Sequence, residues 1–475
     1  MSFLRKCLAG VFLILVLGVG SLAEAQTISS EPYLTGANYY VNGANGSDSN
    51  PGTSRELPWR TIQKAANTMV PGDKVTVLPG TYDQRVQINT SGSAGAPITY
   101  QAEGAVISKG FTVHTDYITI KGFEITNTDN DNQDGWGIYV DASNCVLEGN
   151  YVHFATRGGI RIWATPGNEP NIRNCVIRNN RLDRNSQAGI EVHGRNHLVE
   201  VNEIWDTIQY HPNWTNPPGW VDADGIRFHG SGHIFRKNYI HDIHYGIPEN
   251  PNPHIDCFQT FSNSDHEAAQ NIVFEQNICK NAQVSSTDSI GKGFMLEGAS
   301  NILIRNNLIR AFSSLHINGS DRVTIVNNDL TSDLSIQTAY GPTGVNLDGT
   351  VNTIIKNNIF YDIIPNLTIH LLNDVSKQGL DVGYNCTYRS DGKPMSGSPY
   401  PHDLWGVNPR FVNAGSGDYR LQPFSPAIDV GIMLPEVSDD FEGNPRPQGT
   451  GFDIGAYESQ VKIILLPNII FEGHP

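Results

Sequence analysis

From about residue 115 to 365 the chain repeats a short pattern of alternating apolar and polar positions that ends in Asn and one further apolar residue. The repeats end at Asn150, Asn180, Asn202, Asn238, Asn277, Asn307, Asn328 and Asn358. The shortest steps between these asparagines are 21 and 22 residues, and the longer steps contain insertions. Alternation with a period of two predicts short β-strands and not helices.

A second predicted strand precedes most of these repeats and has the form Gly-apolar-x-apolar. Its copies are residues 137–140, 159–162, 189–192, 225–228, 293–296 and 344–347. A unit of about 22 residues with two or three short strands cannot bury its own apolar face, so successive units must stack. We therefore predict an all-β fold, a right-handed single-stranded parallel β-helix, in which the repeated asparagines form an internal hydrogen-bonded ladder.

The chain divides into four predicted regions. They are a signal peptide at 1–25, an N-terminal cap with the first coils at 26–110, a central β-helix with insertions at 111–365, and C-terminal coils with a closing segment at 366–475. Residues 61–69 are expected to form a helix that caps the open end of the coil. The first region has a basic start, an apolar core and a small-x-small site ending at Ala25, which predicts export from the cytoplasm, secreted or periplasmic, with no membrane span afterwards.

The charge balance and the cysteines of the chain limit its possible partners and bonds. The chain has 32 Lys+Arg against 48 Asp+Glu and a net charge of −16, which argues against a nucleic-acid partner. A monomer is expected. Among the cysteines, Cys145 and Cys175 precede their ladder asparagines by the same spacing, so they share a column that admits either a disulfide or a stacked pair of free thiols.

Stacking aligns the outward side chains of the Gly-apolar-x-apolar strands in columns. The register depends on aligning residues 254–259 with 222–227. One predicted column is Tyr139, Arg161, Glu191, Arg227, Gln259, Met295 and His316. The next is Asp141, Trp163, His193, His229, Phe261, Glu297 and Asn318. Asp224, Asp256 and Lys292 precede these strands, with Asp222 and His254 two residues further back.

This concentration of charged and aromatic side chains predicts a carbohydrate-binding cleft, against the alternative of an ordinary solvated face. The insertions at 205–223, 243–253 and 281–292 all enter just before the same strand, so we expect them to wall this face. Their aromatic residues, on which sugar rings could stack, are Trp205, Tyr210, Trp214, Trp220 and Tyr245.

Three carboxylates in this region suggest a metal site. Asp222, Asp224 and Asp256 lie on adjacent predicted rungs and would repel one another without a cation, and Ca²⁺ prefers oxygen ligands of this kind. The alternative is that each aspartate caps backbone amides at a turn. His254 and His229 would instead suit a transition metal.

The N-terminal cap, the coil and the segment Asp222-Ala-Asp-Gly225 resemble the family-nine pectate lyases, which are secreted β-helix polysaccharide lyases. In that family this segment and a second acidic segment hold calcium, and a lysine in a Gly-Phe-Lys-Leu-Gly-Gly segment is the base. Here the second segment, 255–259, keeps one of three carboxylates, and Met295 stands at the lysine position. Residues 418–458 resemble the closing segment of many secreted β-helix proteins.

The resemblance implies a calcium-assisted lyase acting on an acidic polysaccharide such as pectate, or a related uronan C5-epimerase. Lys292 is then the nearest base, with the histidines as alternatives. A glycoside hydrolase using a carboxylate pair from Glu191, Asp224, Asp256 or Glu297 stays open, as does a non-catalytic binding protein. The expected catalytic residues are Lys292, Asp224, Asp256, His254 and Glu191. The expected substrate-binding residues are Arg161, Arg227, His193, His229, Gln259, Glu297, Trp163, Trp214 and Trp220.

Overall fold

The computed structural model describes residues 36–129, 133–165, 167–209, 211–213, 222–243, 255–263, 266–281, 291–335 and 341–460. The predicted signal peptide, His254, Trp214 and Trp220 lie outside these residues, as do most of the three insertions. The described residues belong to one compact unit. No helix among them is long and apolar enough to cross a membrane.

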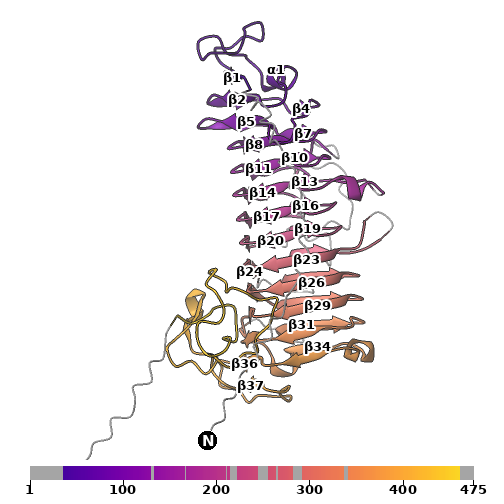
Figure 1. Cartoon of the computed structure of the whole chain (residues 1–475), viewed down its shortest axis with the longest axis vertical. Coiled ribbons are helices and arrows are strands. Elements are labelled where there is room, and N and C mark those ends of the chain that lie inside the picture. Colours follow the sequence, from indigo (N-terminus) through magenta and orange to yellow (C-terminus); the bar gives the residue numbers. More distant parts are fainter. Residues whose placement is uncertain are drawn as a thin grey trace, which may run out of the picture. The chain divides into compact units, whose positions relative to one another are not determined.

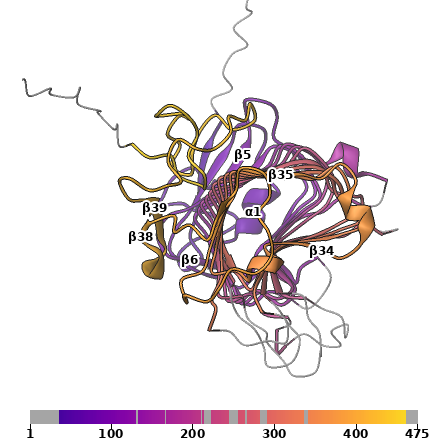
Figure 2. The same cartoon turned by 90° about the horizontal axis from the view of Figure 1, so that it is seen from below.

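Three parallel sheets wind around a common interior, and successive coils follow one another in chain order (Figures 1 and 2). Sheet A contains β1 (Asn38–Val41), β2 (Lys74–Val77), β5 (Ile98–Ala102), β8 (Ile118–Lys121), β11 (Val146–Glu148), β14 (Val176–Arg178), β17 (Leu198–Glu200), β20 (Ile234–Arg236), β23 (Gln270–Glu275), β26 (Ser300–Arg305), β29 (Asp321–Val326), β32 (Ile354–Lys356) and β35 (Asp381–Gly383). Sheet B contains β3 (Gly80–Tyr82), β6 (Val106–Ser108), β9 (Glu124–Ile125), β12 (Tyr151–His153), β15 (Arg181–Asp183), β18 (Glu203–Trp205), β21 (Tyr239–His241), β24 (Ile278–Asn281), β27 (Leu308–Ala311), β30 (Asp329–Thr331), β33 (Ile359–Tyr361), β36 (Cys386–Tyr388) and β37 (Leu404–Trp405).

Sheet C, which carries the Gly-apolar-x-apolar strands, contains β4 (Val86–Ile88), β7 (Phe111–Val113), β10 (Trp136–Val140), β13 (Gly158–Ile162), β16 (Ala188–Val192), β19 (Asp224–Phe228), β22 (Ile255–Thr260), β25 (Gly291–Glu297), β28 (Ser313–Asn318), β31 (Thr343–Asp348) and β34 (Ile369–Leu371). The prediction of an all-β parallel β-helix is confirmed. Outside these sheets lie α1 (Ile62–Ala66), the antiparallel pair β38 (Phe411–Asn413) and β39 (Asp418–Leu421), and four short 3₁₀ turns at 169–171, 365–367, 374–377 and 414–416.

Helix α1 covers the N-terminal end of the coil, as predicted, and packs against β1 and β4. Thr61 caps it, because its side chain accepts a hydrogen bond from the backbone N–H of Lys64. Ile62, Ala65 and Ala66 form its buried face. The helix is shorter than expected, and beyond it the backbone N–H groups of Asn67, Thr68 and Met69 still donate to carbonyls of the helix and its last turn.

The ladder of asparagines is confirmed and fills the interior of one corner of the coil. The Asn180 side-chain oxygen accepts hydrogen bonds from both the backbone N–H and the side-chain amide of Asn150, at 3.0 and 3.1 Å. The Asn180 amide in turn donates to Leu147 O and to Asn202 Oδ1. The same arrangement continues through the repeat asparagines to Asn385. Each ladder amide is thus satisfied, as a buried polar group must be for stability.

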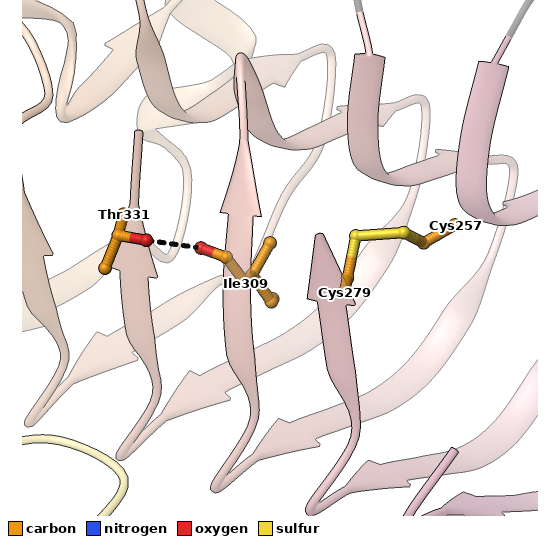
Figure 3. Close-up of a disulfide and its surroundings, with 4 residues drawn as sticks. All are labelled: Cys257, Cys279, Ile309 and Thr331. Atoms are coloured by element: carbon orange, nitrogen blue, oxygen red, sulfur yellow. Dashed lines mark hydrogen bonds between the residues drawn. A yellow bond between two sulfur atoms is a disulfide. The ribbon is translucent and has the colours of Figure 1, made fainter. Parts of the chain in front are cut away.

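A disulfide joins Cys257 of β22 to Cys279 of β24 across the inside of one coil (Figure 3). In the neighbouring coils this position holds Gly225 and Gly293, where an added Cβ would lie 2.5 Å from Ile240 and Ile309 respectively. Where the glycine becomes cysteine, the facing isoleucine position becomes cysteine too. We did not predict this bridge. Cys145 and Cys175 are both free and buried, which selects the stacked-thiol alternative.

The C-terminal segment packs along the side of the coil. The side-chain amides of Gln276 and Asn306 donate to the carbonyls of Asp440 and Asp439 at 2.7 and 2.8 Å. A buried ion pair between Arg446 and Glu458, at 2.7 Å, holds this segment together internally.

Candidate active site

The predicted outward column of sheet C is confirmed by the register of its strands. The paired residues are Tyr139 with Arg161, Arg161 with Glu191, Glu191 with Arg227, Arg227 with Gln259, Gln259 with Met295, and Met295 with His316. Asp256 pairs with Lys292 in the same register. The alignment of 254–259 with 222–227 therefore holds. The roles assigned to these residues remain predictions.

At the centre of this face, Arg227 lies between two of the three predicted calcium ligands. Its Nη2 and Nε donate to Asp224 Oδ2 at 2.6 and 3.0 Å, and Nη2 is 3.8 Å from Asp222 Oδ2. Gln259 accepts from Arg227 Nε at 3.2 Å and donates to Asp222 Oδ2 at 3.4 Å. The third carboxylate, Asp256, forms an ion pair with Lys292 at 3.3 Å.

These contacts do not fit a calcium cage. Ca²⁺ takes six to eight oxygen ligands, whereas here the guanidinium of Arg227 and the ammonium of Lys292 already lie against the carboxylates. The positive charge that the repulsion argument required comes from the protein itself. Calcium binding therefore stays a prediction that belongs to the lyase alternative.

Among the described residues of this cluster, three carboxyls lie near two cations. Burial raises the pKa of the Asp224 carboxyl well above the usual range, and the charges of Asp222 and Asp256 add to that rise against the opposing effect of Arg227. Asp224 Oδ1 is buried and has no hydrogen-bond partner within the described part of the chain. The environment of Asp224 therefore favours its protonated form more than that of an exposed aspartate does.

Access to these groups runs past side chains that keep some exposure. Asp224 and Asp256 are fully buried, whereas Asp222 and Lys292 beside them are 20% and 14% exposed. Arg161, one coil nearer the N-terminus than Glu191, is 18% exposed. The two carboxyls are thus fully buried next to side chains that keep partial exposure.

Next along this face, Glu191 forms the centre of a second charged group. Its Oε1 accepts from Arg161 Nη2 at 2.8 Å and lies 2.7 Å from His193 Nε2. Burial alone would raise the pKa of Glu191, but Arg161 and His193 override it and hold that pKa well below its usual range. Burial lowers the pKa of His193 to about 4 against the effect of Glu191. Glu191 is thus a carboxylate and His193 a neutral imidazole that donates from Nε2.

Aromatic side chains flank this second group. The guanidinium of Arg161 lies 3.8 Å from the ring centroid of Trp163. The predicted second column is confirmed by ring contacts from Trp163 to His193, from His193 to His229 and from His229 to Phe261, at 4.4, 4.6 and 5.0 Å.

One residue of this face was missed. His266 comes from the segment that follows β22, and its ring stacks on His229 with centroids 4.3 Å apart. Arg195 ties the segment to the coil through a 3.0 Å ion pair with Glu267. The sequence signal was a histidine between two acidic residues in a loop, which gives no direction for the loop to fold.

Other predicted residues lie elsewhere. Trp205 is in sheet B, where its ring lies parallel to those of Tyr151 and His241, so its assignment to the cleft is wrong. Glu297 ends β25 in register with Asn318. Met295 is 6% exposed in the position expected from the register. The wall predicted from the insertions lies mostly outside the described residues.

Two curated proteins are similar to part of this chain, and one of them is named as a glycosidase. A lacto-N-biosidase from Bifidobacterium longum subsp. longum is 33% identical over 165 residues, which is 26% of this chain and 10% of that protein. The uncharacterized protein YwoF of Bacillus subtilis (strain 168) is 31% identical over 181 residues, 34% of this chain and 36% of that protein. The chain thus matches only about a tenth and about a third of these curated relatives.

The solved structure of XylC in complex with xylose has the same fold. It superposes with a TM-score of 0.57 at 14% identity and covers 88% of this chain and 98% of its own. Residues 39–311, more than half of the chain, match the family described as "Pel9A-like, right handed beta helix region". The resemblance drawn from the sequence is thereby confirmed, and this chain belongs to the Pel9A-like right-handed β-helix family of carbohydrate-active proteins.

Proposed function

We propose that this protein is a glycoside hydrolase in which Asp224 and Asp256 form the catalytic carboxylate pair. The observation that carries the proposal is a pair of buried carboxyls on adjacent rungs, each beside a different cation. Burial raises the pKa of Asp224, which lies 2.6 Å from the guanidinium of Arg227, while Asp256 lies 3.3 Å from the ammonium of Lys292. Two carboxyls in different environments can serve as acid and base in one site.

In this proposal Asp224 Oδ1 protonates the glycosidic oxygen while the bond to the anomeric carbon breaks. Asp256, which lies 3.3 Å from Lys292, either attacks the anomeric carbon or removes a proton from the attacking water. Arg227 holds Asp224 in place through the bonds described above, and Gln259 accepts a hydrogen bond from Arg227 in turn. Rungs spaced at ~4.8 Å bring both carboxyls to one sugar unit. The glycosidase name of the lacto-N-biosidase relative supports this reaction class.

A polysaccharide lyase is the second candidate, because the matched family is named for Pel9A. Lys292 would be its base, as predicted. In the structure Lys292 is engaged in an ion pair with Asp256, which opposes that role, and Met295 cannot remove a proton. Its substrate would be an acidic polysaccharide, with the uronate carboxylate near Arg161 and Lys292.

We also propose that the protein works outside the cytoplasm. Disulfides persist mainly in oxidising compartments, and the Cys257–Cys279 bridge supports the export predicted from residues 1–25.

The test is the chemistry of the product. Purified protein is incubated with neutral and acidic glycans, with calcium or with chelator, while reducing ends and unsaturated uronates are measured together. We expect new reducing ends without unsaturation, independent of calcium. Asp224→Asn and Asp256→Asn should each lose this activity, whereas Asp374→Asn, at an exposed carboxyl, should retain it. Unsaturated products that require calcium would instead establish the lyase.

A further inference from the structure

Three histidines meet at the edge of the candidate active site. His193 directly follows β16, His229 directly follows β19, and His266 comes from the loop after β22. One ring nitrogen from each lies within 4.8 Å of those of the other two. Three side chains from different coils and a loop thus bring their ring nitrogens close enough together to share one metal ion.

The ring of His229 makes no hydrogen bond to any other described residue. It is fully buried, and neither Nδ1 nor Nε2 has a partner within the described residues. Burial lowers the pKa of His229 well below its usual range, with His193 and His266 adding to the effect, so the ring is neutral and keeps a lone pair. A buried imidazole with both nitrogens unsatisfied is costly unless something binds it.

A second histidine pair in the same coils shows the alternative. His197 and His233 stack at 5.0 Å, and every ring nitrogen is used. Their Nε2 atoms bond the carbonyls of His193 and His229, and their Nδ1 atoms accept from backbone N–H groups. Stacked histidines that serve the fold are therefore fully satisfied in this protein, and His229 departs from that rule.

The hydrogen bond from His193 to Glu191 prepares the first ligand. Because Nε2 donates to the carboxylate at 2.7 Å, the lone pair is on Nδ1. Metal-binding histidines commonly donate their other N–H to a carboxylate in this way, which fixes the tautomer and orients the ring. Arg161 holds Glu191 in turn at 2.8 Å. Trp163 and Phe261 flank the cluster with apolar rings.

We propose that His193, His229 and His266 bind one divalent transition-metal ion of the zinc type. Neutral imidazoles suit such ions, and three histidines with one open position are a known zinc arrangement. Ligand distances of 2.0–2.1 Å place tetrahedral nitrogens ~3.4 Å apart, so the loop need only close slightly. The ion fastens the segment around His266 to β16 and β19, beside the existing Arg195–Glu267 pair. This proposal is independent of the hydrolase, because the ion enters no step of that reaction.

The test is binding of Zn²⁺ and Co²⁺ to the full chain after treatment with a chelator. We expect one ion per chain by calorimetry and by elemental analysis, and a tetrahedral visible spectrum with Co²⁺. His266→Ala and His229→Phe should each weaken binding by more than about 100-fold, and Glu191→Gln by about 10- to 100-fold. His402→Ala, at an exposed histidine outside the cluster, should bind normally.

His229→Phe keeps the test sharp, because it replaces the ring with an apolar one of similar size. We expect it to melt at a higher temperature than the metal-free wild type while losing the rise that Zn²⁺ gives. Absence of tight binding to the wild type would overturn the proposal. If His266→Ala and His229→Phe bound the ion as tightly as the wild type does, the proposal would also be overturned, since the ion would then lie elsewhere.

Discussion

The asparagine ladder and the outer face of sheet C are two buried polar stacks built by the same coils. In the ladder every amide finds partners above and below, as Asn238 does with Asn202 and Asn277. On sheet C, Asp224 Oδ1 and both nitrogens of His229 have none among the described residues. A stack of identical amides therefore satisfies its own hydrogen bonds and stabilises the coil. A stack of different side chains, as on sheet C, leaves some polar atoms without partners among the described residues and available to bind or react.

The largest expected effect lies on the sheet C face. Asp224→Asn removes the proposed acid but keeps the size of the side chain. We expect kcat to fall by about 10³-fold, close to ~4 kcal/mol, for the reaction found in the product assay. Melting temperature should hold, because the amide has nearly the size of the protonated carboxyl and the same lack of charge. A variant that kept full activity would remove Asp224 from the mechanism.

The ladder should respond in the opposite way. Asn238→Ala removes a side chain that bonds Asn202 and Asn277 and leaves buried donors without partners. We expect a loss of about 3 kcal/mol in the free energy of unfolding, measured in denaturant, with kcat unchanged in the folded fraction. A loss below about 0.5 kcal/mol would show that the ladder contributes little.

The disulfide tests whether the facing pair of side chains inside each coil is interchangeable between coils. Cys257→Ser should lose about 2–4 kcal/mol, since the bridge closes a loop with a sequence separation of 22 residues. The double change Cys257→Gly with Cys279→Ile installs the pair found in the adjacent coils and should recover part of that loss. Denaturant midpoints of both variants give the comparison. A double variant less stable than Cys257→Ser would show that the glycine–isoleucine pair cannot replace the bridge in this coil.

The smallest effect is a pH dependence that only one of the two stacks can produce. The pKa of His193 is lowered to about 4 in the folded chain, against an ordinary value of 6.5. Between these values the unfolded chain binds the extra proton, so stability falls as the pH drops, by up to ~1.4 kcal/mol per unit. His193→Gln should flatten this slope. Asn238→Ala should leave it unchanged, because an amide does not titrate.

The sequence was sufficient to predict the strand register, which follows from the spacing of the repeats. Alternation and spacing placed Arg161, Glu191, Arg227 and Gln259 in one column, because a parallel coil leaves no freedom of register. The Gly-to-Cys change at Cys257 was also readable from the alignment, once its facing position was considered.

What the sequence could not provide depends on side chains and loops. The path of the segment carrying His266 follows from contacts such as Arg195 with Glu267, which no repeat dictates. The spacing placed Arg227 beside the predicted calcium ligands, but the ion pair of its guanidinium with Asp224 depends on a side-chain conformation that the spacing does not give. Which cation neutralises a carboxylate cluster is decided by rotamers and not by spacing.

The most direct test of the central claim is whether Asp224 is protonated near neutral pH. Infrared difference spectroscopy of the wild type against Asp224→Asn isolates this one carboxyl from other buried acids such as Asp329, whose pKa burial raises to about 8. We predict a protonated-carboxyl band in the wild type at pH 7 that is missing in the variant. A difference spectrum showing an ionised carboxylate instead would contradict the assignment of Asp224 as the acid.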